Sequence, residues 1–489
     1  MKNMPIFESI YVNPSRRDLL KKLVALGVTS LAVSPLAYSR SLANSESRII
    51  YRDDPDYDDW RRSMLWKSNA PDRYPDVIIQ AKSEQEITQA LKFAQKNDLQ
   101  VVCRTSGHNA SSSVLRNGGM LLDISALNEL TVDAQHKFAY VQPSVKMIHL
   151  NEELRKHGLD FPTASCQTVS LGGYLLGGGI GANTRYWAKG PACYSIISAD
   201  VILADGKKIT ASKEQNEDIY WAIRGIGPGF FGIVTRFKLQ VFPSIKAILK
   251  NTYSYPIDQL PKVIKSLDRF SKQHTQDERV SVGISVHNHP SIAGEMIVKL
   301  GVTAFIDNAQ DPTATAKALL APYAKSTFAG DAFDKSENVH VQIEKMKFST
   351  NPADRSNQDN FTTDNAHAFV AIAKLFKDRP TPGFLILDLS YNSFNHERLK
   401  DASYSALGKH KISAIMHWKN AADDPVATKW FARFNALMQP YANSHYINEV
   451  NHEFPERVKN SFTSEKWEYI SMLRNKYDPN KRFHTYLAY

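Results

Sequence analysis

A histidine stands at the tip of a loop of small polar residues that directly follows a predicted buried strand at 99–103. The loop reads Arg104-Thr105-Ser106-Gly107-His108-Asn109. Backbone N–H groups in such a loop can hold an anion, as the loops that bind pyrophosphate do. Phosphate-binding loops rarely use a histidine, so His108 is a candidate for chemistry. An ordinary polar loop with a surface histidine is the alternative interpretation.

A cysteine precedes a second segment, which is dense in glycine. It reads Ser165-Cys166-Gln167-Thr168-Val169-Ser170-Leu171-Gly172-Gly173 and later Gly177-Gly178-Gly179-Ile180-Gly181. So many glycines predict backbone that lies against a large flat ligand, or turns with positive φ. The spacing from Gly177 to Ala182 fits the dinucleotide fingerprint in form. That fingerprint requires a buried strand directly before it, and only Tyr174-Leu175-Leu176 stands there, so we reject it.

The chain has three cysteines, Cys103, Cys166 and Cys193. They are too few for a disulfide framework, their spacing fits no zinc knuckle, and we expect no metal site. At most one disulfide could form, which raises the question of what the remaining sulfur is attached to. A third segment runs from Asp218 through Gly225-Ile226-Gly227-Pro228-Gly229 into a predicted strand at 232–241. Ligand approach and plain packing explain this turn equally well.

Together these segments resemble a known family. Residues 72–243 resemble the FAD-binding domain of the vanillyl-alcohol oxidase superfamily, in its berberine-bridge-enzyme-like branch. The resemblance implies that the loop 104–109 wraps the pyrophosphate of FAD. It further implies a covalent bond from His108 to the 8α-methyl group of the isoalloxazine ring, and a second from Cys166 to position 6. The residues implied to line the flavin are Thr168, Val169, Gly172, Gly173, Gly178, Ile180 and Gly181, with Ile233 and Val234 near the adenosine half.

The downstream segment Tyr446-Ile447-Asn448-Glu449 resembles the Tyr-x-Asn signature of this branch, and 476–483 resembles its closing segment. A flavin oxidises a C–H bond by accepting hydride, so a base must take the proton of the substrate's hydroxyl group. Tyr446 is the first candidate, on the expectation that a neighbouring cation lowers its pKa. Glu449, Lys189 and His417 are the other candidates, although His417 on its apolar strand also suits a structural role.

Two departures from the family lie at expected substrate contacts. Where members often have Lys-Tyr-Gly after the glycine cluster, this chain has a different sequence, and Tyr186 or Lys189 is expected to replace that tyrosine. Glu449 stands where well-known members often have another tyrosine. The substrates of relatives therefore do not transfer, and we expect only a small organic substrate: an alcohol, amine, sugar or hydroxylated ring.

The electron acceptor is predicted from Val169. In this branch the residue after the Cys-x-Thr stretch gates oxygen, and valine usually accompanies oxidases. We therefore expect oxygen as the acceptor and hydrogen peroxide as the product. The alternative is a dehydrogenase that passes electrons to a quinone or a partner protein. Two further hypotheses are a flavin-carrying protein without turnover and a nicotinamide dehydrogenase, which would bind NAD and no yellow chromophore.

The N-terminal region carries paired arginines, Arg16 and Arg17, before a moderately apolar run at 23–37 and small-residue cleavage options. This pattern predicts a twin-arginine signal peptide over 1–43 and export of the folded protein, to the periplasm or the exterior, by the twin-arginine machinery. A basic helix that stays on the protein is the alternative. Covalent links would prevent loss of FAD after export, where no free FAD is available.

The elements around these segments predict an α+β fold. We expect a two-subdomain, PCMH-type FAD-binding domain at 44–245 and a substrate-binding domain at 246–450, built on an antiparallel sheet covered by helices. Residues 451–489 should return to the FAD domain. The polar stretch 351–364 lacks periodicity and predicts a loop. The predicted strands of the second domain are 280–287, 296–303, 384–389 and 412–418, and its helices are 260–273, 313–324 and 428–438.

Composition limits the function classes. The 489 residues carry a formal charge of +10, of which the leader supplies +4, with no basic run of five or more. The excess suits an acidic small substrate or plain solubility. Nucleic-acid binding is not needed to explain it.

Overall fold

The computed structural model describes residues 48–164, 166–180, 190–292, 295–340, 354–377, 384–391, 401–406, 408–487 and 489. The predicted leader lies outside these residues, as do Gly181, Tyr186 and Lys189. All described residues belong to one unit, Ser45–Tyr489. Within the described residues, no helix has the length and apolar character needed to cross a membrane.

A four-stranded sheet positions the histidine loop. Its strands run in the order β1-β2-β4-β3, with β2, β4 and β3 parallel and β1 antiparallel. The connection between β2 and β3 is helix α4, where the Ser83 hydroxyl accepts a hydrogen bond from the Glu86 N–H and caps the first turn. The loop 104–109 follows β3 directly. The elements of this sheet are β1 (Arg48–Tyr51), α3 (Tyr57–Ser63), β2 (Val77–Gln80), α4 (Glu84–Lys96), β3 (Val101–Arg104) and β4 (Met120–Asp123).

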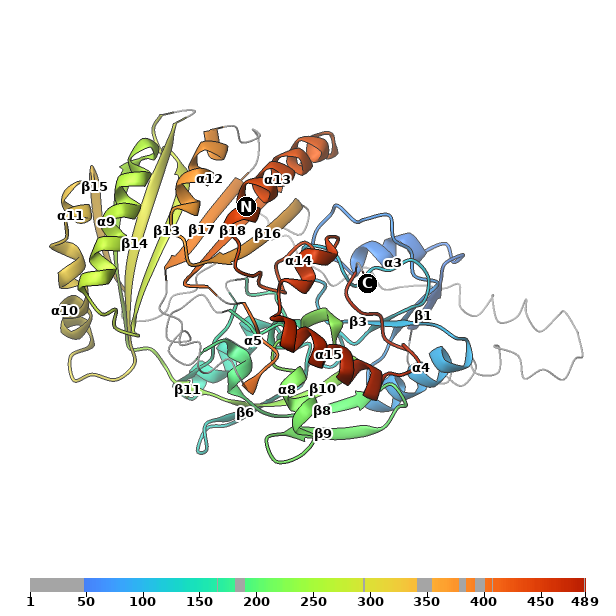
Figure 1. The fold of residues 1–489 in the computed structure, drawn as a ribbon. Helices are drawn as coiled ribbons and strands as arrows, with labels where there is room; N and C mark the ends of the chain where they lie inside the picture. The colour runs from blue at the N-terminus through green and yellow to red at the C-terminus, as the bar shows by residue number, and fades with distance from the viewer. Residues whose placement is uncertain are drawn as a thin grey trace, which may run out of the picture. The chain divides into compact units, whose positions relative to one another are not determined.

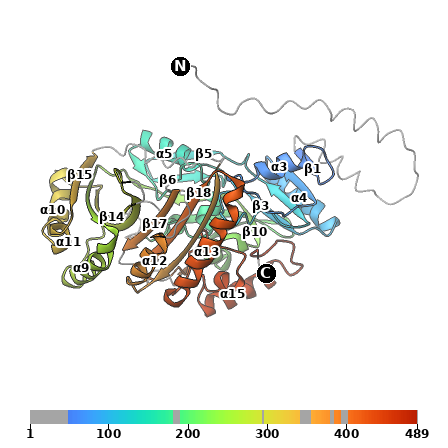
Figure 2. The same ribbon diagram turned by 90° about the horizontal axis from the view of Figure 1, so that it is seen from above.

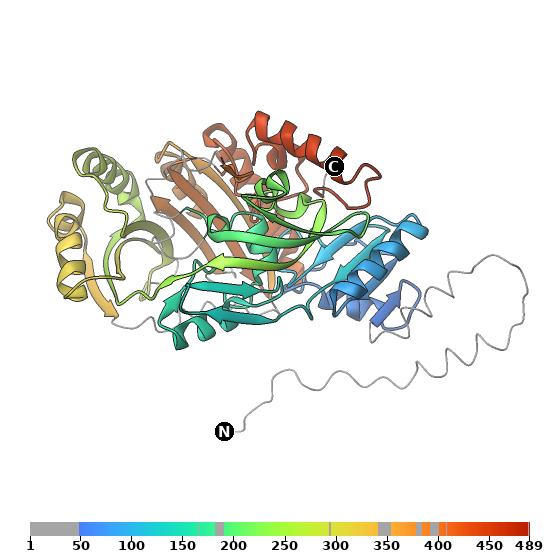
Figure 3. The same ribbon diagram turned by 90° about the horizontal axis from the view of Figure 1, so that it is seen from below.

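A five-stranded antiparallel sheet, in the order β5-β6-β10-β8-β9, lies beside the first sheet (Figure 3). Helices α5 and α6 lie between β6 and β8 in the chain, and α6 begins in the glycine-dense segment. Leu171 and Leu175 of α6 are fully buried in the same apolar core as β6, β8 and β10, which fixes that segment against the sheet. The elements are β5 (Leu130–Asp133), β6 (Phe138–Val141), α5 (Met147–Lys156), β7 (Leu159–Asp160), α6 (Leu171–Leu176), β8 (Ile196–Leu203), β9 (Lys208–Ser212), α8 (Glu217–Ala222), β10 (Gly232–Gln240) and β11 (Phe242–Pro243).

A seven-stranded antiparallel sheet forms the second domain, in the order β15-β12-β14-β13-β17-β18-β16 (Figure 1). Helices α9, α12 and α13 lie along one face (Figure 2), where their apolar side chains share one core with the sheet. Lys411, Ser413 and His417 lie at alternate positions of β18, so they share the other face. The elements are β12 (Ala247–Pro256), α9 (Leu260–Gln273), β13 (Val280–Asn288), β14 (Met296–Ile306), α10 (Pro312–Ala324), α11 (Thr327–Gly330), β15 (Asp334–His340), β16 (Arg355–Thr363), α12 (Ala368–Lys377), β17 (Phe384–Tyr391), β18 (His410–Trp418) and α13 (Asp424–Met438).

After α14 (Pro455–Lys459) and α15 (Ser464–Tyr477), the chain returns to the four-stranded sheet. Phe483 forms a parallel bridge with Val101 of β3. The Val101 N–H donates to the Arg482 carbonyl at 2.7 Å, and the Arg482 guanidinium donates to the Leu99 carbonyl at 2.6 Å. This segment therefore supports the strand that leads into the histidine loop.

The predicted α+β class and the helix-covered antiparallel sheet are confirmed. The predicted loop at 351–364 is wrong, because β16 occupies Arg355–Thr363 and pairs with β18 along its full length. The sequence of β16 shows no apolar alternation because its buried Asp359 and Asn360 are polar and bind neighbouring segments. The domain boundaries at 43, 245 and 450 stay predictions.

Candidate functional site

The histidine loop is held close to the segment that follows α3. Gly107 has a φ of +69°, and a Cβ there would lie 1.9 Å from the Met64 carbonyl oxygen, so only glycine fits. The Arg104 guanidinium donates to the same carbonyl at 3.2 Å and pairs with the buried Asp123 carboxylate at 2.9 Å. The Arg104 side chain therefore holds the loop against Met64, and its positive charge is paired with Asp123.

His108 and Cys166 are brought to a common hydroxyl group. The Oγ1 atom of Thr168 lies 3.0 Å from the His108 Nε2 atom and 3.3 Å from the Cys166 Sγ atom. At least two arrangements of protons satisfy both contacts. In the first, the His108 Nε2–H donates to Thr168 and the Thr168 O–H donates to the sulfur; in the second, the Cys166 S–H donates to Thr168 and the Thr168 O–H donates to Nε2. The first arrangement leaves the lone pair of His108 on Nδ1.

The environment of His108 favours a neutral imidazole. Burial lowers the pKa of His108 to about 4, and the charges of Arg104 and Lys146 act in the same direction. The indole of Trp66 is stacked on the imidazole with ring centroids 5.2 Å apart and planes inclined by 10°. The ring is therefore neutral at physiological pH and is covered on one face.

The glycine-dense segment is bonded directly to the histidine loop. The Ser170 hydroxyl contacts the Thr105 hydroxyl at 2.8 Å and the Ser106 hydroxyl at 2.9 Å. In α6, a Cβ at Gly172 would press on Pro143 and Thr105, whereas a Cβ at Gly173 would meet no atom within 4 Å. The backbone at Gly173 therefore borders open space beside the two loops.

Tyr446 reaches the end of the same segment. Its hydroxyl oxygen accepts hydrogen bonds from the Gly179 N–H at 3.2 Å, the Ile180 N–H at 3.1 Å and the Asn448 Nδ2 atom at 3.1 Å. Asn448 occupies the space at Gly177, where a Cβ would lie 1.9 Å from the amide oxygen. Three donors converging on one oxygen stabilise negative charge there.

The pKa of Tyr446 is raised, contrary to the expectation from the sequence. Burial is the main cause, and the Glu449 carboxylate adds to it, while the three donors act in the opposite direction. The expected cation is present, since the Lys411 ammonium lies 5.3 Å from the centre of the Tyr446 ring. Lys411 is paired with Glu449 at 2.6 Å, and this pairing offsets its effect on the phenol.

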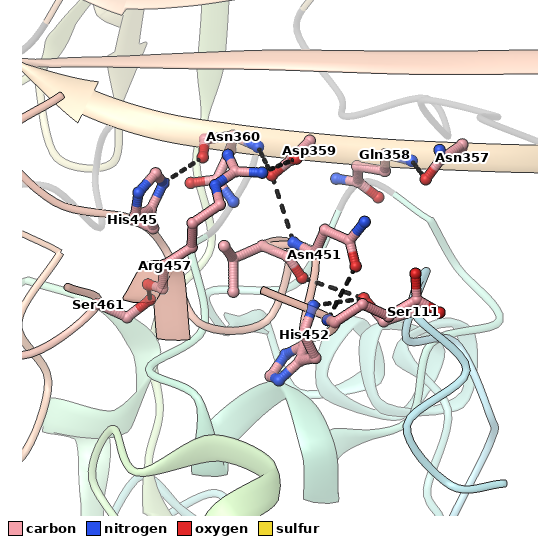
Figure 4. A network of polar contacts seen from close by, with 12 residues as sticks. Ser111, Asn357, Gln358, Asp359, Asn360, His445, Asn451, His452, Arg457 and Ser461 are labelled. Carbon is pink, nitrogen blue, oxygen red and sulfur yellow. Dashed lines mark hydrogen bonds and ion pairs between the residues drawn. The ribbon is translucent and has the colours of Figure 1, made fainter. Parts of the chain in front are cut away.

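A buried polar network anchors the Tyr446 segment to β16 (Figure 4). The Asn360 side chain accepts from the Tyr446 N–H at 2.7 Å and donates to the Tyr446 carbonyl at 3.0 Å. Beside it, the buried Asp359 carboxylate pairs with Arg457 and accepts from the Asn451 N–H. These contacts fix the backbone that presents the Tyr446 hydroxyl.

Two histidines in this network make stability depend on pH. Burial lowers the pKa of His445 and His452 to about 4, against about 6.5 in an unfolded chain. Between these values the unfolded chain binds protons that the folded chain excludes, so stability is lost as the pH falls through this window. We expect the Tm in calorimetry to drop from about pH 7 to about pH 5. The drop in Tm should be smaller in His452→Asn than in wild type. In His136→Asn, whose ring is exposed, it should equal that of wild type. An equal drop in wild type and both variants would contradict this account.

The other predicted residues fall into four groups. His417 lies on β18 with its ring edge on Trp66, at a centroid distance of 6.1 Å, so it shares this indole with His108. Asn109 donates to the Asn448 carbonyl at 3.3 Å and connects the two ends of the site. The residues Ile233 and Val234 are buried in β10, opposite Ile202 and Val201 of β8. Gly181, Tyr186 and Lys189 lie outside the described residues.

Sequence reasoning missed three residues of the site. Trp66 carries no motif, because its role depends on a contact across 42 positions of the chain. Lys411 belongs to a strand whose alternation was visible, but its ion pair with Glu449 needs the fold. Asn448 could have been found, since it is the third residue of the Tyr-x-Asn signature.

Comparison with known proteins bears on the cofactor. The sequence model of the family described as "FAD binding domain" matches residues 75–212. This region is an FAD-binding domain. The FAD-linked oxidoreductase nodO of Hypoxylon pulicicidum is 27% identical over 440 residues, which cover 89% of this chain and 96% of that protein.

Two solved structures share the fold. The 6-hydroxy-D-nicotine oxidase of Arthrobacter nicotinovorans superposes with a TM-score of 0.76 and 20% identity, covering 90% of this chain and 97% of that chain. The berberine bridge enzyme of Eschscholzia californica superposes with a TM-score of 0.74 and 17% identity, covering 93% and 98%. The predicted enzyme class, an FAD-linked oxidoreductase, is confirmed, and the predicted fold is that of the berberine-bridge-like proteins.

Proposed function

We propose that this chain oxidises a small organic substrate by hydride transfer to FAD, and that the FAD is bonded covalently through His108 and Cys166. The observation that carries the proposal is the shared hydroxyl of Thr168, which lies within hydrogen-bond distance of both the imidazole and the thiol. Positions 6 and 8 of isoalloxazine lie on the same ring. Two attachment residues must therefore stand side by side, as these two do.

The residues around this pair fit a flavin. At Gly173 no atom lies within 4 Å of the position that a Cβ would take, so no side chain blocks a ring at that point of the backbone. The loop 104–109 would hold the pyrophosphate, and Thr168, Val169 and Gly172 would border the ring. The flavin supplies the hydride acceptor.

Tyr446 is the base that we propose. Its oxygen has three donors aimed at it, so the charge that develops when it holds no proton is stabilised by groups already in place. Glu449 is less suited because its carboxylate is already engaged by the Lys411 ammonium at 2.6 Å. His417 packs on Trp66, and burial lowers its pKa. Tyr446 therefore takes the proton, and Glu449 with Lys411 binds polar groups of the substrate.

Oxygen is the acceptor that we propose, on the basis of Val169. A Phl p 4 variant in which one isoleucine is replaced by valine is a glucose oxidase, whereas wild-type Phl p 4.0202 is a glucose dehydrogenase. A single methylene group can thus separate the two activities in proteins of this fold. In this chain Val169 is partly buried against the core that carries α6.

Replacement of Val169 by Ile should slow reoxidation by oxygen. The added methylene narrows the path of oxygen to the flavin ring. We expect the rate of reoxidation to fall at least about tenfold, which corresponds to a barrier about 1.4 kcal/mol higher. Stopped-flow mixing of the reduced enzyme with oxygen measures it, and the rate of reduction by substrate should stay the same. Val132→Ile, a partly buried valine on β5, is the matched control. An unchanged rate in Val169→Ile would remove Val169 from the oxygen path.

We also propose that the protein is exported in folded form. The support is the paired arginines and apolar run within 1–43. A covalent cofactor suits this route, because attachment before transport prevents loss afterwards.

The experiment that tests the proposed function has two parts. The purified protein is precipitated with acid, and retained flavin absorbance in the pellet supports covalent attachment. The native enzyme is then given a panel of alcohols, amines, sugars and hydroxylated rings, scored for bleaching of the flavin and for peroxide. Bleaching with slow recovery in air would select a dehydrogenase with a quinone or protein acceptor, and a colourless protein would overturn the proposal.

A further inference from the structure

Residues 64–69, which we name the bridging segment, contact both the histidine loop and the substrate sheet. On the loop side, the Met64 carbonyl accepts from Arg104, and the Trp66 N–H donates to the Gly107 carbonyl at 3.4 Å. Gly107 permits this close approach of the loop to Met64, because a Cβ at position 107 would not fit. The backbone of the bridging segment therefore has a fixed position relative to His108.

The other side of the bridging segment is bonded to the start of β16. The Asn69 side chain accepts from the Ser356 N–H at 3.0 Å and donates to the Ser356 carbonyl at 3.1 Å. The buried Lys67 ammonium donates to the Ala110 carbonyl and contacts the Ser356 carbonyl at 3.4 Å, so one side chain joins loop and sheet. The backbone of Trp66 lies between these contacts and is therefore held from both sides.

The Trp66 indole fixes the plane of the His108 imidazole. The contact between Nε2 and the Thr168 hydroxyl fixes the position of that nitrogen but does not by itself fix the plane of the imidazole. A face-to-face stack with planes 10° apart fixes the plane of the ring. His417 packs against the indole with an interplanar angle of 78°. The imidazole plane is thus set by Trp66, and the indole in turn by the substrate sheet.

We propose that Trp66 is a positioning residue for the attachment of FAD to His108, holding the imidazole so that Nδ1 faces the 8α-methyl group. The inference rests on the proposed covalent linkage. Attachment forms a bond between Nδ1 and the methyl carbon. One hydrogen leaves the methyl group and one leaves the imidazole, and the two electrons reduce the ring. Oxygen then reoxidises the ring and leaves as hydrogen peroxide. Attack at carbon needs the Nδ1 lone pair in line with that carbon, so a freely rotating imidazole reacts more slowly.

The test compares the two linkages within one sample. The full-length protein is expressed with ample riboflavin as wild type, Trp66→Leu and Trp66→Phe, and flavin peptides from its digest are assigned by mass to His108, Cys166 or both. Wild type should carry flavin bonded to both residues. In Trp66→Leu the His108 linkage should fall about five- to tenfold relative to the Cys166 linkage, the factor expected from loss of a stacked aromatic pair. Trp66→Phe keeps an aromatic face and should therefore retain most of the His108 linkage.

Four further outcomes decide whether Trp66 positions the imidazole. Trp60→Leu, which removes a partly buried tryptophan of α3 without touching His108, should leave both linkages as in wild type. A general loss of folding would lower both linkages together. An equal fall of the His108 and Cys166 linkages in Trp66→Leu would therefore overturn the positioning role. An unchanged His108 linkage in that variant would overturn it as well. If wild type itself holds no acid-stable flavin, the proposed function fails instead.

Discussion

A variant that carries both His108→Ala and Cys166→Ala should lose all acid-stable flavin. Each substitution removes one of the two nucleophiles that share the Thr168 hydroxyl, and no other described histidine or cysteine contacts Thr168. The single variants should each keep one linkage, so their acid pellets stay yellow. Absorbance of the redissolved pellet and the mass of the denatured chain measure the result.

The controls for this experiment are a histidine and a cysteine away from the site. His136 is exposed on the connection between β5 and β6, and Cys193 is buried in the core, where burial raises the pKa of its thiol to about 12 and makes it a poor nucleophile. His136→Ala and Cys193→Ala should keep both linkages. Acid-stable flavin in the double variant would show that another residue is attached.

Replacement of Tyr446 by Phe should reduce the rate of flavin reduction by about 10²- to 10⁴-fold, the range for loss of a general base. The fold should survive, because the backbone of residue 446 is held by Asn360 and not by the phenol. Stopped-flow bleaching under anaerobic conditions measures the reduction step alone. Tyr255→Phe removes a buried phenol of the substrate domain that bonds only the Phe328 carbonyl, and serves as the matched control.

The pH profile gives this prediction a second readout. Burial and Glu449 raise the pKa of Tyr446, so the phenol keeps its proton at neutral pH. The proton-free form gains population only as the pH rises into the alkaline range. The wild-type rate of reduction should therefore increase from neutral to alkaline pH, and the increase should vanish in Tyr446→Phe. A flat wild-type profile, or a variant that keeps the increase, would assign the base to another residue.

The sequence predicts the α+β class from local patterns, and the pair His108 and Cys166 from the resemblance of two local motifs to a known family. The helix predicted at 260–273 is α9 (Leu260–Gln273), since its apolar stripe has helical spacing. β16 could not be predicted in this way, because Asp359 and Asn360 are buried with polar partners from distant segments. The direction of the Tyr446 pKa depends likewise on the distance between Lys411 and Glu449, which no pattern in the sequence contains.

The bridge between Phe483 and Val101 joins the C-terminal segment to the strand that leads into the histidine loop. The Arg482 guanidinium reaches back to the Leu99 carbonyl across 383 positions, and the Arg116 guanidinium donates to the Thr485 carbonyl. The strand that leads into the histidine loop therefore gains these contacts only after residue 485 has been synthesised. We expect loading of the cofactor to be completed after translation, once this segment has reached the strand.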